Sequence, residues 1–131
     1  MNKRLKAFSG YVLILAAGLG VGYAASHAAV WLKPAYREGN YSAYFPNAQS
    51  KVVLYGTSWC AFCAKTRSYL REHNINFVDL DIEKSPAAAA QHKQLGGGGV
   101  PVVLIGDRKI QGFNSREFDA AISRLSDTGG S

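Results

Sequence analysis

The sequence predicts an α/β domain that follows a single transmembrane helix. Residues 7–32 contain no charged side chain, and from residue 51 onward β-rich runs alternate with helix-like runs in the order β-α-β-α-β-β-α. Such an order implies a four-stranded mixed sheet covered by three helices, with the first two strands parallel through a right-handed crossover. We therefore divide the chain into four segments: a membrane anchor or signal segment (1–33), a linker (34–50), the α/β domain (51–125) and a polar tail (126–131).

The formal net charge of +6 comes mainly from the N-terminal part of the chain. Residues 1–37 contain five basic side chains and no acidic one, whereas residues 38–131 contain ten basic and nine acidic side chains. The basic excess flanks an apolar stretch and forms no basic face, so it indicates membrane topology and argues against nucleic-acid binding. With two cysteines in all, the chain is not a disulfide-dense scaffold.

The uncharged stretch is long enough to cross a lipid bilayer. As a helix, residues 7–32 would span about 39 Å, against about 30 Å for the hydrocarbon core of a membrane. A cleaved secretory signal is the alternative, with residues 3–6 as its basic region and Ser26-His27-Ala28 as the cleavage site. The apolar run is longer than a usual signal core, so we favour an uncleaved anchor.

The basic residues before Ala7 outnumber those after Leu32, where Glu38 offsets Arg37. The positive-inside bias then predicts a cytoplasmic N-terminus and an exported C-terminal domain. We expect a single-pass protein of the inner (plasma) membrane with its domain in the periplasm. If the segment is cleaved, the domain would instead be released into the periplasm.

The first half of the domain shows two strands and two helices. Lys51–Tyr55 is a β-rich run that predicts a buried strand, and a helix should follow from near Cys60 to about Asn74. Asn76–Ile82 alternates apolar and polar residues, which predicts a second strand. Ser85 is a candidate N-cap with Pro86 at the first helical position, so a second helix should continue through Ala87–Leu95.

The second half begins with four glycines, residues 96–99, which should end that helix. Val100–Ile105 predicts a third strand that Pro101 interrupts early, and Lys109–Gln111 a short fourth strand. Asn114 and Glu117 form a capping-box-like pattern that opens the last helix. Its predicted apolar face consists of Phe118, Ala121, Ile122 and Leu125.

Both cysteines lie in Trp59-Cys60-Ala61-Phe62-Cys63, between the first strand and the first helix. A Cys-x-x-Cys at such a junction is typical of redox-active proteins. Backbone N–H groups and the helix dipole favour a thiolate at Cys60, and Cys63 lies one turn later, where it can attack a mixed disulfide formed by Cys60. Cys60 is the predicted nucleophile and Cys63 the predicted resolving thiol.

Two other functions stay open for this cysteine pair. It could be half of a zinc or iron–sulfur site, although the chain offers no two further ligands at a convincing spacing, and we expect no bound metal or cofactor. It could also belong to a redox-sensing adaptor that binds a partner without turnover.

Three separated features resemble the glutaredoxin family of the thioredoxin fold, over roughly residues 51–125. They are the segment from Trp59 to Cys63, Gly99-Val100-Pro101 and Gly112-Phe113-Asn114. The resemblance implies a thioredoxin-like fold and an oxidoreductase that acts on protein or small-molecule disulfides, with glutathione or another thiol as reductant. It also implies that Pro101 is a cis-proline facing the dithiol and that the Val100 backbone pairs with an extended substrate. The substrate-binding set that it implies is Trp59, Phe62, Gly99, Val100, Pro101, Gly112, Phe113 and Asn114.

The sequence also departs from the usual family pattern. Ala61-Phe62 replaces Pro-Tyr between the cysteines, and Thr57 stands where a lysine is common. The segment before the last helix looks closer to the glutaredoxin-like hydrogen donors of ribonucleotide reductase, several of which do not depend on glutathione. Glutathione and another thiol donor therefore both stay open as reductants.

Overall fold

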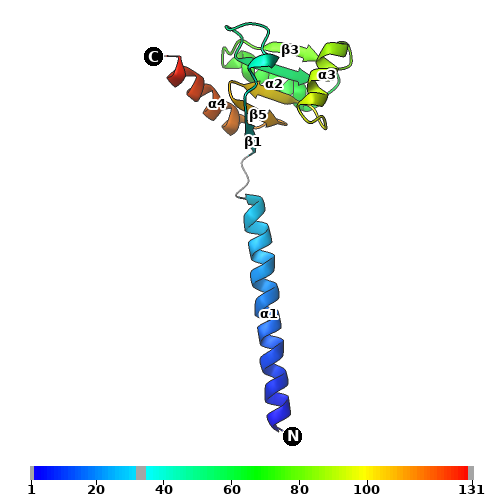
Figure 1. The fold of residues 1–131 in the computed structure, drawn as a ribbon, viewed down its shortest axis with the longest axis vertical. Coiled ribbons are helices and arrows are strands. Elements are labelled where there is room, and N and C mark those ends of the chain that lie inside the picture. Colours follow the sequence, from blue (N-terminus) through cyan, green and yellow to red (C-terminus); the bar gives the residue numbers. More distant parts are fainter. Residues whose placement is uncertain (1, 32–34, 130–131) are drawn as a thin grey trace. The chain divides into compact units, whose positions relative to one another are not determined.

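The structure, a computed structural model, describes residues 2–31 and 35–129 of the chain. Two compact units are present, Met1–Pro34 and Ala35–Ser131. The described residues of the first unit form the helix α1 (Asn2–Trp31), drawn in blue in Figure 1. Its span Asn2–Ala28 is long and apolar enough to cross a membrane, a test that a signal sequence also passes. The expected end of this segment, at residue 33, lies outside the described residues.

The second unit is a thioredoxin-like α/β fold (Figure 1). Its sheet has the strand order β1-β5-β4-β2-β3, in which β2 and β3 are parallel and the other neighbours are antiparallel. The predicted order of strands and helices from residue 51 onward is therefore confirmed. The elements are β1 (Tyr36–Glu38), the 3-10 helix η1 (Ser42–Tyr44), β2 (Val52–Gly56), α2 (Ala61–Glu72), β3 (Val78–Asp81), α3 (Pro86–Gln94), β4 (Val102–Ile105), β5 (Arg108–Gln111) and α4 (Ser115–Thr128).

The sheet has five strands where the sequence predicted four. The additional strand is β1, which lies in the segment expected to be a linker and pairs Tyr36 with Ile110 of β5. Three residues are too short to show an alternation of apolar and polar side chains, and the partner strand lies at the other end of the domain sequence. At the C-terminus, α4 continues to Thr128, so residues 126–128 are helical where a polar tail was expected.

A separate apolar cluster lies on each face of the sheet. On one face, Leu70 of α2 and Phe118 and Ala121 of α4 pack against alternate residues of the central strands, including Leu54 and Val103. On the other face, Ala88 of α3 and Leu95 pack against the intervening residues. Three aromatic residues in and next to η1 also lie against this second cluster: Tyr41, Tyr44 and Phe45. The central strands β2 and β4 are thus buried from both sides, as the apolar run of β2 predicted for that strand.

Local sequence signals account for the helix starts. The Ser85 side chain accepts a hydrogen bond from the N–H of Ala88 at 3.2 Å, with Pro86 in the first turn of α3. The Asn114 side chain accepts one from the N–H of Glu117 at 3.3 Å and caps α4. Both predicted N-caps are confirmed. These caps fix the residue at which the chain leaves each preceding loop and enters the helix.

Candidate active site

Cys60 is the N-cap residue of α2, directly after the loop that leaves β2. Its Sγ accepts a hydrogen bond from the backbone N–H of Cys63 at 3.1 Å. Backbone N–H groups at a helix N-terminus favour negative charge, so this position suits a sulfur that acts as a nucleophile. The residue is 8% exposed and, unlike Cys63, it lines a pocket. The predicted position of Cys60 at a helix N-terminus is confirmed.

Cys63 lies in the first turn of α2 and is fully buried. Burial, with a smaller contribution from the hydrogen bond to Cys60, raises the pKa of the Cys63 thiol from 9.0 to about 11. A backbone hydrogen bond from Thr57 and the charge of Arg67 act in the opposite direction. Cys63 is therefore a protonated, shielded thiol in the reduced protein, while Cys60 is the sulfur that an incoming molecule can reach. Both cysteines are free thiols in this structure.

The segment opposite the dithiol comes from the loop before β4. The peptide bond between Val100 and Pro101 is cis, as the resemblance to the family implied. The Cys60 Sγ lies 3.8 Å from the carbonyl oxygen of Val100. Pro101 is buried, and its own carbonyl accepts a hydrogen bond from the N–H of Gly112 at 2.8 Å. The segment is thus held between the dithiol and the start of the loop before α4.

A pocket of about 530 Å³ opens beside Cys60. Its lining residues are Thr57, Trp59, Cys60, Ala61, Phe62, Ile82, Glu83, Gly98, Gly99 and Val100. The Trp59 and Phe62 side chains are 71% and 62% exposed, and the Trp59 indole N–H donates to Glu83 Oε1 at 2.9 Å. An apolar pocket with a sulfur at its edge can accept an extended or small apolar disulfide.

The predicted substrate-binding residues divide into two groups. Trp59, Phe62, Gly99 and Val100 line this pocket, with Pro101 next to it in sequence. The other group, Gly112, Phe113 and Asn114, joins β5 to α4 and is not among the lining residues. Phe113 packs edge-on against the rings of Tyr69 and Phe118, and Asn114 caps α4. Gly112 connects the two groups through its hydrogen bond to Pro101.

Three residues near the site were not predicted to belong to it. Arg67 has a side chain only 14% exposed and forms an ion pair with Asp79. His92 is buried, and its Nε2 lies 3.4 Å from the carbonyl oxygen of Gly99. Thr57 is buried beside the dithiol, and its hydroxyl has no hydrogen-bond partner among the described residues. No local pattern signals these contacts, because each partner comes from another element.

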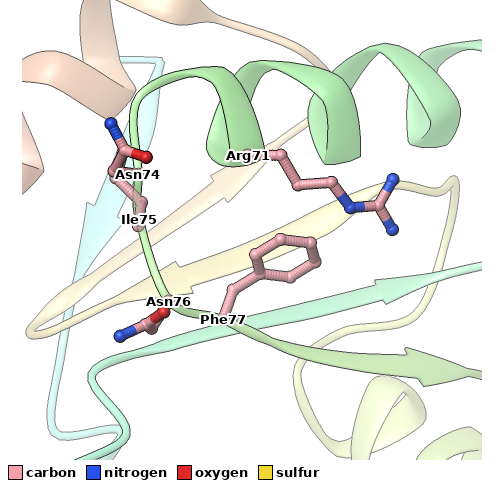
Figure 2. A pocket seen from close by; sticks show the side chains of 5 residues that line it. All are labelled: Arg71, Asn74, Ile75, Asn76 and Phe77. Carbon is pink, nitrogen blue, oxygen red and sulfur yellow. The ribbon is translucent and has the colours of Figure 1, made fainter.

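A second pocket, of about 340 Å³, lies at the other end of α2 (Figure 2). Figure 2 shows Arg71 extending over the ring of Phe77, with Asn74, Ile75 and Asn76 in the connecting loop. The Arg71 guanidinium is 6.0 Å from the centre of that ring. Since a 12-residue helix is about 18 Å long, this pocket is remote from the dithiol. Among the described residues, no group of three or more His, Cys, Asp or Glu side chains is arranged to hold a metal ion.

Sequence comparisons match this domain to glutaredoxins. The glutaredoxin family profile matches residues 52–110. A glutaredoxin-like 8.6 kDa protein, uncharacterized, from the rubredoxin operon of Clostridium pasteurianum is 35% identical over 74 residues, which cover 56% of this chain and 99% of that protein. A glutaredoxin of Pseudomonas aeruginosa is 27% identical over 62 residues, which cover 47% of this chain and 74% of that protein.

Solved structures show the same fold. The glutaredoxin of Archaeoglobus fulgidus aligns with a TM-score of 0.52 and 26% identity, over 66% of this chain and 96% of that one. The glutaredoxin-like protein NrdH-redoxin from Escherichia coli aligns with a TM-score of 0.50 and 23% identity, over 53% of this chain and 91% of that one. The family profile, the nearly complete coverage of the Clostridium protein and the position of the cysteine pair agree. This chain belongs to the glutaredoxin family.

Proposed function

We propose that the protein is a membrane-tethered thiol–disulfide oxidoreductase that acts through Cys60 and Cys63. The observation that carries the proposal is the asymmetry of the two sulfurs. Cys60 Sγ accepts a helix N-terminal N–H at the edge of a pocket, whereas Cys63 is fully buried one turn behind it. One sulfur is thus suited to attack from the surface and the other to act only after the first has reacted.

The reaction proceeds in two exchanges. The Cys60 thiolate attacks one sulfur of the substrate disulfide, forms a mixed disulfide and releases the other substrate sulfur as a thiolate. Cys63 then loses its proton to solvent and attacks Cys60 Sγ. The Cys60–Cys63 disulfide forms, and the second substrate thiolate leaves. The substrate disulfide gains two electrons and the dithiol loses them; a thiol donor returns the dithiol to its reduced state.

The substrates are protein or small-molecule disulfides, and the lining of the pocket supports this class. Trp59 and Phe62 offer exposed apolar surface beside Cys60, and Gly99 and Val100 line the same pocket. The donor is glutathione or another thiol. The family of this chain favours glutathione, whereas Thr57, in place of the common lysine, removes a positive charge that would attract a carboxylate.

The tether is the helix α1. Its length and composition suit a membrane span, and the basic residues in its first turns favour a cytoplasmic N-terminus. The redox domain would then lie in the periplasm, tethered to the inner membrane. A reporter fused after residue 50 tests this orientation, because alkaline phosphatase is active only when exported. Activity of a cytoplasmic reporter at that position would refute it, and a shortened N-terminus found by mass spectrometry would show a cleaved signal instead.

Turnover of insulin or a small disulfide by the full chain in detergent tests the chemistry. Cys60→Ser should abolish turnover. In Cys63→Ser, Cys60 should still attack the substrate disulfide, and the mixed disulfide should accumulate and be visible by mass spectrometry. The two variants differ from each other only in which sulfur is lost, so each is the control of the other. Substrate binding without turnover in the unmodified chain would favour an adaptor, and zinc or colour in the purified protein would favour a metal-binding module.

Running the assay with glutathione and its reductase, and again with a dithiol donor, separates the two reductants. Turnover with glutathione assigns that donor, and turnover with the dithiol alone assigns another. The Cys60–Cys63 reduction potential completes the test, because a potential near that of strong disulfide oxidants would overturn the direction of electron flow written here.

A further inference from the structure

An ion pair behind the dithiol joins Arg67 of α2 to Asp79 of β3. The Arg67 Nε lies 2.7 Å from Asp79 Oδ2 and its Nη2 lies 3.2 Å from Oδ1, so the contact is bidentate. The remaining nitrogen, Nη1, donates to the carbonyl oxygen of Thr57 at 3.2 Å. Two independent partners therefore hold the guanidinium in one position.

Gly56 brings this guanidinium close to the resolving cysteine. A Cβ at position 56 would lie 3.0 Å from Cys63 Sγ and 3.3 Å from Arg67 Nη2. Both atoms therefore border the same small space above the glycine, which puts the guanidinium within about 6 Å of the sulfur, the range in which an opposite charge favours a thiolate. A residue with a side chain at 56 would separate them.

The charged and titratable groups around Cys63 are few. On its own helix are Cys60 and Arg67, and across from them on β3 are Asp79 and Asp81, which act on Arg67. Of these groups, Arg67 is the one cation. Its charge opposes the effect of burial on Cys63, and the carboxylate of Asp79 partly offsets that charge.

We propose that Arg67 is a positioning residue for the second exchange, and that it stabilises the Cys63 thiolate as this thiolate attacks the mixed disulfide at Cys60. Asp79 moderates the effect, because it neutralises part of the Arg67 charge. The inference rests on the proposed oxidoreductase function, in which Cys63 must lose its proton before the substrate thiolate can leave. Arg67 thus favours the attack by Cys63 and Asp79 opposes it, and neither residue changes the rate of the first exchange at Cys60.

The full chain in detergent, reacted with 5,5′-dithiobis(2-nitrobenzoic acid), reports the two exchanges separately. Attack by Cys60 releases one coloured thiolate at a rate that depends on reagent concentration. Attack by Cys63 on the resulting mixed disulfide releases a second coloured thiolate, and the rate of this step does not depend on reagent concentration. Stopped-flow absorbance between pH 6 and pH 9 therefore gives a first and a second phase for each variant.

Arg67→Gln should slow the second phase about threefold at neutral pH, and Asp79→Asn should speed it by a similar factor. Each pKa unit changes the fraction of Cys63 present as thiolate tenfold. The expected change in rate is smaller, because a less basic thiolate is also a weaker nucleophile. Plots of the second-phase rate against pH should shift in opposite directions for the two variants. Arg67→Lys should restore the rate to within about twofold. Lys65→Gln, the same charge change on α2 at a side chain that lies over the Phe113 ring, is the matched control and should change neither phase.

Opposite changes of the second-phase rate in the two variants distinguish this role from a structural one. Both Arg67→Gln and Asp79→Asn break the same ion pair, so a merely structural role would shift the second phase in the same direction in both. That result, or no shift in either variant, would overturn the role of Arg67 while the first phase stands. Loss of the first phase in the unmodified chain would instead refute the oxidoreductase proposal itself.

Discussion

The Cys60 Sγ lies 3.8 Å from the carbonyl oxygen of Val100, a residue 40 positions further along the chain. This contact joins the helix N-terminus that holds the nucleophile to the loop that precedes β4. The adjoining pocket is lined by exposed aromatic residues, Trp59 and Phe62, and by the glycine-rich segment of residues 98–100. The shape of that glycine-rich segment should therefore control which disulfides reach the sulfur.

Gly99→Thr should narrow the pocket without disturbing the fold. A Cβ at position 99 would meet no heavy atom within 4 Å, and Gly99 is not among the glycines with positive φ. We expect the free energy of unfolding to change by less than about 0.5 kcal/mol. The KM for insulin should rise severalfold, because a protein substrate must pass between the new side chain and Trp59, whereas a small disulfide should react as before. Urea unfolding and steady-state kinetics measure the two effects.

Gly98→Thr is the matched comparison. Gly98 has φ of +86°, and a Cβ there would lie 3.2 Å from Gln111 Nε2. A β-branched residue in this conformation should cost about 1–2 kcal/mol of stability. Equal destabilisation by the two threonine substitutions would contradict the distinction between these neighbouring glycines.

The parts of this structure that depend on local signals could be predicted from the sequence. Ser85 with Pro86 and Asn114 with Glu117 mark helix starts within four residues, and the apolar runs of β2 and β4 mark buried strands. The position of Cys60 at the start of α2 follows from the same kind of local pattern. Each of these features is decided by neighbours in sequence, so tertiary contacts did not need to be known.

The contacts between elements could not be predicted in the same way. Trp59 meets Glu83, and Arg67 meets Asp79, only because β2 and β3 are parallel with Leu54 opposite Asp79. An amphipathic pattern cannot reveal that register, and a charged residue on a helix is usually solvated. No local pattern shows that the Phe62 side chain is exposed at the pocket. Strand β1 was not predicted, because this segment is a strand only through its pairing with β5.

Phe118→Ala should destabilise the domain by about 3–5 kcal/mol. The Phe118 ring is fully buried between α4 and the sheet and lies 5.7 Å, centre to centre, from the rings of both Tyr69 and Phe113. Phe62→Ala removes the same group from an exposed position and should change stability by less than about 0.5 kcal/mol. Chemical unfolding of the two variants checks this. A similar loss in both would mean that Phe62 is packed in solution.

Tyr36→Ala should loosen β1 from the sheet edge. The Arg108 guanidinium lies 4.0 Å from the centre of the Tyr36 ring and is nearly buried, so this contact should be worth about 1–2 kcal/mol. Tyr36→Phe keeps the ring and should retain most of that stability. Hydrogen exchange at the amides of β5 would report the loosening directly. Unchanged protection of β5 in Tyr36→Ala would show that backbone pairing alone holds β1.

The burial of Cys63 predicts how the stability of the reduced protein depends on pH. Its pKa is about 11 in the folded protein against an ordinary value of 9.0, so the folded state keeps a proton that the unfolded state loses. The stability that the thiol contributes is therefore fully present below pH 9 and is lost as the pH rises from 9 to 11, by about 3 kcal/mol in all.

Urea unfolding of the full chain in a phosphine reductant, from pH 8 to pH 10, measures this loss. The window ends at pH 10 because burial also raises the pKa of Tyr55 and of Tyr69 to about 12, and both begin to contribute above their ordinary value of 10.0. About half of the Cys63 effect should be seen by pH 10. Cys63→Ser carries a hydroxyl that does not titrate in this range, so its stability should change less between the two pH values. Parallel curves for the two proteins would mean that the Cys63 thiolate is solvated in the folded state, and the resolving sulfur would then be accessible without any prior reaction at Cys60.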